Sequence, residues 1–211
     1  MWAPPEVLVL EDDGDQLRTL RELVERAHLE PLATSTPRQA MARLEGRRPI
    51  LAIIDLDMSR VPASERRVGV DDVLRRLHHR HVNCIPLVYS AGVESIDDQA
   101  RVYLLHPHAL FQSKRHGEER LLERVNGLLG GRVGDLALQD GVVVHLPSGE
   151  PMPHRVAVSL FTAKRANRPL LLSESDARAA RRFQRWLQAC DSSVLVRALG
   201  NRHYQLAVRE E

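Results

Sequence analysis

The sequence contains little of what marks several common protein classes. Among its 211 residues there are only 2 cysteines, and 4% of the residues are aromatic. Cys84 and Cys190 each lie in a segment that reads as buried, which predicts two reduced thiols and excludes a disulfide scaffold. No apolar run approaches the ~18 residues that a membrane helix needs, and no basic stretch precedes an apolar one at the N-terminus. We therefore expect a cytoplasmic protein with no membrane partner.

Several catalytic motifs are also missing. The chain has no glycine-rich nucleotide loop, no hydrolase nucleophile turn and no Cys/His spacing typical of a zinc site. We therefore expect that it is not an enzyme. Its 43% hydrophobic and 27% charged residues are the composition of an ordinary soluble protein. At this length, two small domains are favoured over one large domain.

Charge is distributed unevenly along the chain. Residues 1–131 contain 18 Lys and Arg against 20 Asp and Glu, whereas residues 132–211 contain 12 against 8. A glycine-rich stretch at 130–134 follows a predicted helix end and is typical of a hinge. These features predict a neutral-to-acidic domain at 1–131 and a basic domain at 132–211. A basic domain favours a nucleic-acid partner.

The first half alternates short apolar runs with segments of helical periodicity. Five strands are predicted from the runs at 7–10, 32–33, 50–54, 85–89 and 109–111. Because a crossover between parallel strands needs a helix, this alternation predicts an α/β fold with a parallel five-stranded sheet covered on both faces. In such sheets, ligands bind at the carboxyl ends of the strands.

Polar residues suited to phosphoryl chemistry stand at the ends of four strands. In chain order they are Glu11 and Asp12, Asp55, Ser90, and Lys114. Adjacent carboxylates repel unless a cation intervenes, and Mg²⁺ accepts one or two carboxylates beside phosphate oxygens. The pattern predicts that Glu11 and Asp12 hold Mg²⁺ and that Asp55 is the phosphoryl-accepting nucleophile. Lys114 would pair with the phosphate, and Ser90 would bind one of its oxygens.

In this order, the blocks resemble the receiver domains of two-component response regulators. The resemblance covers nearly all of residues 6–130 and rests on the blocks at Glu11–Asp13, Asp55–Met58, Ser90–Ala91 and Lys114. It implies a flavodoxin-like (βα)5 receiver with strand order 2-1-3-4-5, a sensor histidine kinase as partner, and a homodimer. It also implies that the backbone carbonyl of Asp57 is a further metal ligand. Ser90 and Phe111 would be switch residues that reorient together on phosphorylation.

The sequence departs from the receiver pattern at two places. Arg115 stands where the family usually has proline, so the loop after the fifth strand is expected to differ. The chain at 59–68 is several residues longer than the usual tight turn, and we expect this insertion to overhang the site and to slow dephosphorylation or to recognise a particular kinase. Two alternatives stay open: a flavodoxin-like fold whose acidic strand ends are merely solvated, and a degenerate receiver that signals without phosphate.

The second domain is predicted to be a small α+β domain. Its expected elements are strands at 136–139 and 142–146, a helix at 155–166, a strand at 170–172, a helix ending at 189, and a hairpin at 194–199 and 204–208. This order resembles the winged helix found on response regulators, and it implies a DNA-binding output in transcriptional control. The predicted DNA-binding residues are four arginines on one helix and one at the wing tip: Arg178, Arg181, Arg182, Arg185 and Arg202.

The spacing leaves a second interpretation open. A winged helix normally has two helices before its wing, but only about twenty residues separate Leu172 from Val194, which is enough for one long helix. Either the helix-turn-helix is compressed or the domain has another use. The alternative is a protein–protein interaction module, in which the basic domain docks on a kinase, a scaffold or an acidic protein. The arginines could also be a solvated helix face with no binding role, opposite Phe183 and Leu187.

Overall fold

The structure is a computed structural model that describes residues 5–27, 29–81, 84–129, 132–139, 142–152, 154–165 and 169–208. They divide into two compact units, Glu6–Glu123 and a second containing Arg124–Glu211. Helix α5 (Gly117–Leu129) spans this division. Gly130 and Gly131 of the predicted hinge lie outside the described residues, and a domain boundary after residue 131 stays a prediction.

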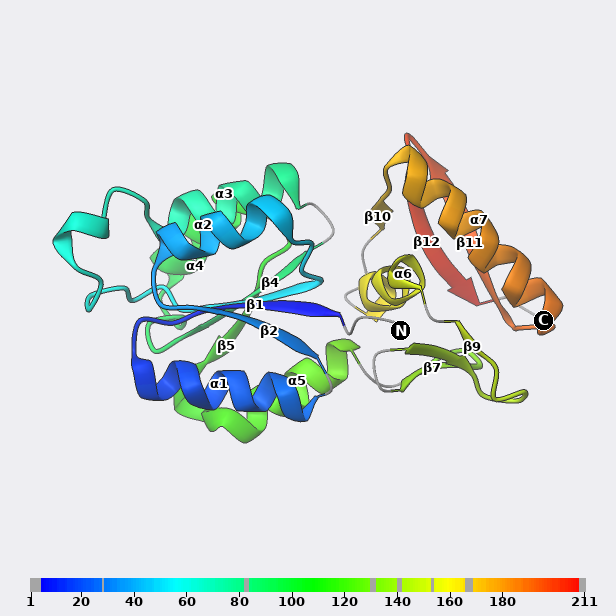
Figure 1. The fold of residues 1–211 in the computed structure, drawn as a ribbon, viewed down its shortest axis with the longest axis horizontal. Coiled ribbons are helices and arrows are strands. Elements are labelled where there is room, and N and C mark those ends of the chain that lie inside the picture. The colour runs from blue at the N-terminus through cyan, green and yellow to red at the C-terminus, as the bar shows by residue number, and fades with distance from the viewer. Residues whose placement is uncertain are drawn as a thin grey trace. The chain divides into compact units, whose positions relative to one another are not determined.

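The first unit is built on a parallel five-stranded sheet (Figure 1). The strands are β1 (Glu6–Leu10), β2 (Glu30–Thr34), β3 (Leu51–Ile54), β4 (Ile85–Ser90) and β5 (Leu110–Ser113). Their order is β2-β1-β3-β4-β5, which confirms the predicted parallel sheet and its strand order. Leu10 pairs with Ile54, and Ile54 pairs with Val88, so the carboxyl ends of the central strands lie level with one another.

Helices cover both faces of this sheet. They are α1 (Gly14–Arg26), α2 (Pro37–Gly46), α3 (Val70–Arg80), α4 (Ile96–Leu105) and α5. Helices α1 and α5 lie on one face, and α2, α3 and α4 lie on the other (Figure 1). Side chains cap two of these helices, since Thr36 and Ser95 accept hydrogen bonds from the backbone N–H groups of Gln39 and Asp98. Two short 3-10 helices, η1 (Ala63–Glu65) and η2 (Lys114–His116), lie in loops.

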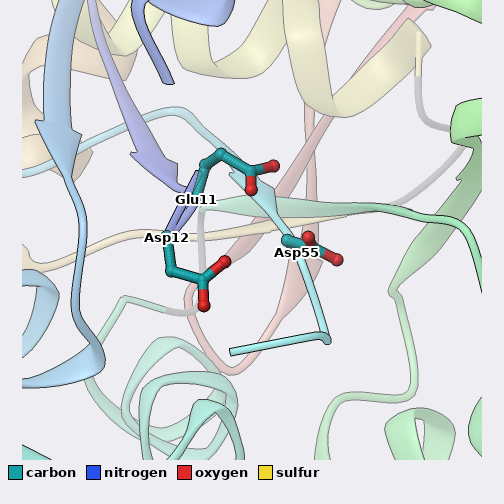
Figure 2. Close-up of side chains that lie close together, drawn as sticks. All are labelled: Glu11, Asp12 and Asp55. Atoms are coloured by element: carbon teal, nitrogen blue, oxygen red, sulfur yellow. The ribbon is translucent and has the colours of Figure 1, made fainter. Parts of the chain in front are cut away.

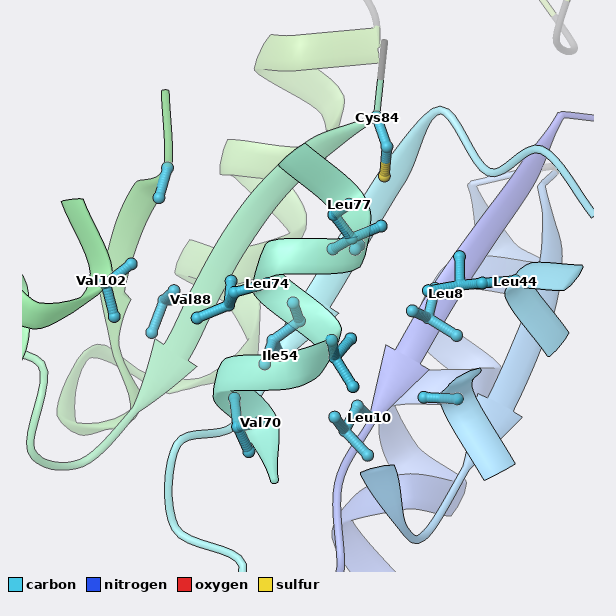
Figure 3. Packing of buried hydrophobic residues seen from close by; sticks show 14 of the residues in the cluster. Leu8, Leu10, Leu44, Ile54, Val70, Leu74, Leu77, Cys84, Val88 and Val102 are labelled. Carbon is cyan, nitrogen blue, oxygen red and sulfur yellow. The ribbon is translucent and has the colours of Figure 1, made fainter. Parts of the chain in front are cut away.

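The core of the first unit holds the central strands in place. Side chains alternate across the sheet, and Leu8, Leu10 and Ile54 face α2 and α3, where they pack with Leu44 and Leu74 (Figure 3). All five side chains are 0–1% exposed. Burying one such side chain contributes about 1.5–3 kcal/mol. The strands whose ends carry the polar residues are therefore rigid supports.

The second unit contains two small antiparallel sheets. Strands β6 (Arg132–Val133), β7 (Leu136–Gln139), β8 (Val142–His145) and β9 (Pro151–Met152) form one sheet in sequence order. Strands β10 (Leu170–Leu171), β11 (Val194–Gly200) and β12 (His203–Val208) form the other, in the order β10-β12-β11. Helices α6 (Arg155–Arg165) and α7 (Glu174–Ala189) complete the unit. Residues 140 and 141, where the sequence Asp-Gly between two apolar runs indicates a hairpin turn, lie outside the described residues.

The elements from residue 155 onward follow the predicted order. A single continuous helix, α7, lies between β10 and β11, so residues 169–208, all of them described, hold no turn between two helices. The closing hairpin turns at Asn201 and Arg202, whose φ angles of 45° and 61° suit the two-residue turn that matches strand twist. The winged-helix-like assignment of this unit stays a prediction.

Gly134 lies in a tight turn between β6 and β7, not in a free hinge. Its φ is +59°, and a Cβ atom there would come within 2.7 Å of Val194 Cγ2 and 2.9 Å of Ser193 Oγ. Glycine is required because a side chain would be strained by the backbone and would clash with the start of β11. The sequence-based hinge at 130–134 is thus corrected for 132–134, which pair as strand and turn.

Candidate functional site

Three carboxylates meet at the carboxyl ends of β1 and β3. Glu11 and Asp12 follow β1, and Asp55 follows β3 (Figure 2). One oxygen from each of the three lies within 4.8 Å of the others. Glu11 is 1% exposed and Asp55 is 4% exposed. Buried carboxylates at this spacing need a cation, and a set of oxygen donors is what Mg²⁺ prefers, so these residues fit that ion.

Lys114 supplies a positive charge to this cluster. Its Nζ atom donates to Glu11 Oε2 at 2.7 Å, to Gln16 Oε1 at 2.8 Å, and to Asp55 Oδ2. The ammonium also lies 5.9 Å from the ring centre of Tyr89. Lys114 follows β5 directly, so its backbone is fixed by the sheet. The structure therefore brings together four of the predicted residues: Glu11, Asp12, Asp55 and Lys114.

Burial and charge act against each other on the ionisable groups here. Burial raises the pKa of Glu11 above its usual value, and the charge of Asp55 adds to this, although Lys114 partly offsets both. Burial alone would lower the pKa of Lys114, but its hydrogen bonds to Asp55 and Glu11 outweigh burial and raise it. Lys114 is therefore a firmly held ammonium, placed where the negative charge of a phosphoryl group would need compensation.

The other predicted residues of this site lie at the same edge but not in the cluster. Ser90 ends β4 and is 2% exposed, and among the described residues no hydrogen bond joins it to the three carboxylates. Phe111 of β5 is half-buried and packs edge-on against Tyr103 of α4, with ring centres 5.1 Å apart. The side chain of Asp57 is exposed, and its backbone N–H donates to Asp55 Oδ1 at 3.1 Å. That contact closes a local turn at 55–57.

Two contacts were not anticipated from the sequence. Gln16, in the first turn of α1, accepts a hydrogen bond from Lys114, and nothing in the sequence distinguishes it from other polar helix residues. Arg60, in the predicted insertion, donates its backbone N–H to Asp12 Oδ2 at 2.6 Å and pairs its guanidinium with Asp13. The length of the insertion was the only signal that this segment contributes to the site.

The contacts of Arg115 show how the chain accommodates this residue where the receiver pattern has proline. Its backbone N–H donates to Ser113 Oγ at 3.3 Å. Proline could not make this bond, because it has no backbone N–H. The bond to Ser113 caps the 3-10 turn η2, which follows β5. The guanidinium of Arg115 pairs with Glu94 at 3.0 Å. The loop still delivers Lys114 to Asp55.

The predicted arginines of the second unit share one face of α7. Arg178, Arg181, Arg182 and Arg185 are all exposed and line a common surface pocket with Ser175 and Gln184. The opposite face of α7 is buried through Ala180, Phe183 and Leu187. Within the described part of the chain, none of the four forms an ion pair. Arg202 is exposed at the tip of the β11–β12 hairpin, so all five predicted arginines are accessible to solvent.

Comparisons with known proteins bear on the first unit. No protein-family model matches the chain, and no curated protein matches it significantly. None of the helices in the described ranges is long and apolar enough to cross a bilayer. Among solved structures, the chain is similar to a CheY-like response regulator receiver domain protein from Methanospirillum hungatei, with a TM-score of 0.50, 17% identity, and coverage of 59% of this chain and 92% of that one.

Two further similarities have lower scores. The signal receiver domain of a DNA-binding response regulator from Colwellia psychrerythraea has a TM-score of 0.49 and 18% identity, covering 59% of this chain and 97% of that one. TrrA from Thermotoga maritima, solved in complex with Mg²⁺-BeF, has a TM-score of 0.47 and 15% identity, covering 58% and 96%. At 17% identity, the similarity to the Methanospirillum protein shows a shared fold and no more. The unit of residues 6–123 has the fold of a response regulator receiver domain.

Proposed function

We propose that this protein is a two-component response regulator that accepts a phosphoryl group on Asp55 from a sensor histidine kinase. The observation that carries the proposal is the contact of Lys114 with both Glu11 and Asp55, beside Asp12. These four residues come from three different strand ends. A merely solvated acidic edge gives no reason for a buried carboxylate pair with a lysine between its members.

Each residue of the cluster has a separate role in the proposed phosphoryl transfer. A carboxylate oxygen of Asp55 forms a bond to phosphorus while the N–P bond of a phosphohistidine breaks, and the leaving imidazole takes up a proton. Glu11, Asp12 and the backbone carbonyl of Asp57 are the proposed Mg²⁺ ligands with Asp55. Bound Mg²⁺ supplies compensation for charge on the phosphoryl oxygens. Lys114 offers a second positive charge, and the hydroxyl of Ser90 offers a hydrogen bond to one oxygen.

The proposed response passes through β4, β5 and α4. Val88, two residues before Ser90, pairs with Phe111, whose ring contacts Tyr103 of α4. A hydroxyl drawn toward a phosphate would change the packing around Phe111 and so the surface of α4. That surface exposes Tyr103 and also Ile96 and Leu104, which are 82% and 87% exposed. These apolar side chains support the proposed homodimer. Sedimentation velocity with and without beryllofluoride measures the fraction of dimer.

Replacing Asp55 by asparagine tests the phosphoryl transfer. The wild-type protein should incorporate an acid-stable, hydroxylamine-sensitive phosphoryl group from acetyl phosphate in the presence of Mg²⁺, because an acyl phosphate forms on a carboxylate. Asp55→Asn should show only the incorporation seen without Mg²⁺. Asp97→Asn, which changes an exposed carboxylate in the first turn of α4, is the matched control and should behave as wild type. Equal incorporation by Asp55→Asn would refute the proposal, and no Mg²⁺-dependent uptake by wild type would favour a degenerate receiver.

We further propose that the second unit binds DNA through the exposed face of α7. The support is the set of four arginines without ion pairs among the described residues, together with Arg202 at the hairpin tip. Arginines on one exposed helix face suit contacts to a phosphate backbone, and a wing arginine adds a further contact. The output of the regulator would then be transcriptional control.

The double variant Arg181→Ala/Arg182→Ala tests this output. Wild-type protein should shift a random DNA duplex at low salt, with an affinity that falls steeply as salt rises, because counterions are released. The double variant should bind more weakly on every sequence, with a salt slope reduced by about 2 if both arginines contact phosphates. Arg38→Ala, an exposed arginine of α2, should leave binding unchanged. No shift at low salt by the phosphorylated or unphosphorylated wild type would favour the protein-interaction alternative.

A further inference from the structure

The insertion between β3 and α3 is fastened to the acidic edge by one residue. The backbone N–H of Arg60 donates to Asp12 Oδ2 at 2.6 Å, and its guanidinium pairs with Asp13. Asp13 also caps α1, accepting hydrogen bonds from the backbone N–H groups of Asp15 and Gln16. Arg60 is thus a cation held against two of the three successive acidic residues that follow β1.

The insertion has internal bonds that keep its shape. The guanidinium of Arg66 donates to the carbonyls of Val61 at 2.8 Å and Ser59 at 2.7 Å. Val61 is 3% exposed, and its N–H donates to the carbonyl of Met58 at 3.2 Å. Because these bonds close the segment on itself, residues 59–66 form one small body. Among the described residues, its bonds to Asp12 and Asp13 are those of Arg60.

A metal ion on Asp12 would compete with this arrangement. Magnesium demands near-ideal octahedral geometry, and a carboxylate oxygen already accepting a short N–H bond is a poorer ligand. The positive guanidinium beside Asp13 also repels an incoming divalent cation. Any ion that takes Asp12 therefore weakens the hold of Arg60 on the site.

We propose that Arg60 is a metal-responsive tether: it holds the insertion on Asp12 and Asp13 without Mg²⁺ and releases it when Mg²⁺ binds. Arg60 is a positioning residue and not a catalytic one. The proposal rests on the proposed function only in taking the same acidic cluster as the metal site. It adds that Mg²⁺ binding and release of the insertion are coupled. Mg²⁺ favours release, and release raises the affinity for Mg²⁺ by the same factor.

Two measurements with Mg²⁺ alone as the probe test the tether. In Arg60→Ala, titration calorimetry at low ionic strength should show Mg²⁺ affinity up to about fivefold tighter than wild type, the upper end of the range for an exposed ion pair. Arg67→Ala, an exposed arginine of the same insertion, is the matched control and should keep wild-type affinity. The gain in Arg60→Ala should shrink at high salt because screening weakens the competing charge.

The rate of limited proteolysis within the insertion measures the same coupling. Trypsin should cut after Arg66 or Arg67 severalfold faster in wild type when Mg²⁺ is added. Arg60→Ala loses the side-chain pair with Asp13 and keeps the backbone bond to Asp12, so without Mg²⁺ it should be cut faster than wild type, and Mg²⁺ should accelerate its cleavage less. Wild-type Mg²⁺ affinity in Arg60→Ala, no Mg²⁺ binding by either protein, or cleavage indifferent to Mg²⁺ in wild type would each overturn the tether. If Mg²⁺ releases the insertion but Asp55 takes up no phosphoryl group, the tether stands and the proposed function fails.

Discussion

Replacing Lys114 by alanine should lower the free energy of unfolding of the first unit by about 3–5 kcal/mol in the absence of Mg²⁺. Glu11 and Asp55 are almost fully buried, and Lys114 is only 16% exposed. Removing the ammonium leaves two neighbouring buried carboxylates with no direct counter-charge from the chain, which is the costly case for a buried ion pair. Phosphoryl uptake should fall as well, because a positive charge is lost where the phosphoryl oxygens would lie.

Mg²⁺ should restore most of the stability lost in Lys114→Ala, since a divalent cation replaces the ammonium between the carboxylates. Amide hydrogen exchange in β1, β3 and β4 measures this for the first unit separately from the second. The loss should also become smaller as the pH is lowered into the range where Glu11 takes up a proton. Burial holds the pKa of Glu11 above its usual value, so the folded protein takes up a proton more readily than the unfolded chain, and stability from this group falls as pH rises.

Lysine at position 114 is itself informative in this chain. Lys114 and Lys164 are the only lysines among 30 basic residues, and all the others are arginine. A compact ammonium fits between Glu11, Gln16 and Asp55, whereas a planar guanidinium needs more space and directs its donors in a fixed fork. Lys164→Ala is the matched control, and it should leave exchange in the first unit and phosphoryl uptake unchanged. Wild-type stability in metal-free Lys114→Ala would contradict the assigned role of Lys114.

The main features of the site could be predicted because strand ends are a strong constraint. Glu11 and Lys114 are 103 residues apart, yet parallel strands in one sheet bring their carboxyl ends to one edge. Once the apolar runs identify the strands, the residues after them are placed together without further information. The same argument explains why Ser90 is found at this edge.

The contacts of Gln16 and Arg60 could not be predicted in the same way. Gln16 reaches Lys114 only because the first turn of α1 starts directly after Asp13, and Arg60 reaches Asp12 because the insertion folds back on itself through Arg66. Neither contact follows a periodic pattern. In the second unit, β6 and β9 have two residues each, too few for any alternation to show.

The single helix between β10 and β11 has a physical consequence for the output. The sequence indicates room for only one helix there, and α7 fills it from Glu174 to Ala189. Its N-cap is Ser173, and its buried face recurs at helical spacing from Ala177 to Leu187. A turn inside it would break this face. In the proposed DNA-binding function, the contacts of the four α7 arginines would therefore be made along one continuous helix, whose orientation depends on the packing of its far end.

That packing depends on a buried polar network centred on Asp135. Its carboxylate accepts hydrogen bonds from Ser192 Oγ at 2.6 Å and the backbone N–H of Ser193 at 2.7 Å, and it lies 3.3 Å from His145 Nε2. His145 is 3% exposed, and its other ring nitrogen lies 2.8 Å from Ser148 Oγ. The network joins the turn before β7 and strand β8 to the segment between α7 and β11.

Replacing Asp135 by alanine should lower the free energy of unfolding of the second unit by about 3 kcal/mol, because several donors lose a charged acceptor and at least one of them, on Ser192, stays buried. Asp135→Asn keeps one carbonyl acceptor and should lose about 1–2 kcal/mol. Urea unfolding followed by Trp186 fluorescence in a Trp2→Phe background measures both, since Trp186 lies 6.4 Å from the His145 ring, and Glu174→Ala is the exposed control.

The pH dependence of Asp135→Ala separates a charged acceptor from simple packing. Burial alone would raise the pKa of Asp135, but the bonds from Ser192 and Ser193 and the charge of His145 outweigh it and lower the pKa below its usual 3.8. A carboxylate with a lowered pKa stabilises the fold above that value, and its contribution is lost as pH falls below it. The difference between wild type and Asp135→Ala should therefore be full at neutral pH and shrink in strong acid. A difference that stays constant through acid titration would show that Asp135 acts by shape alone.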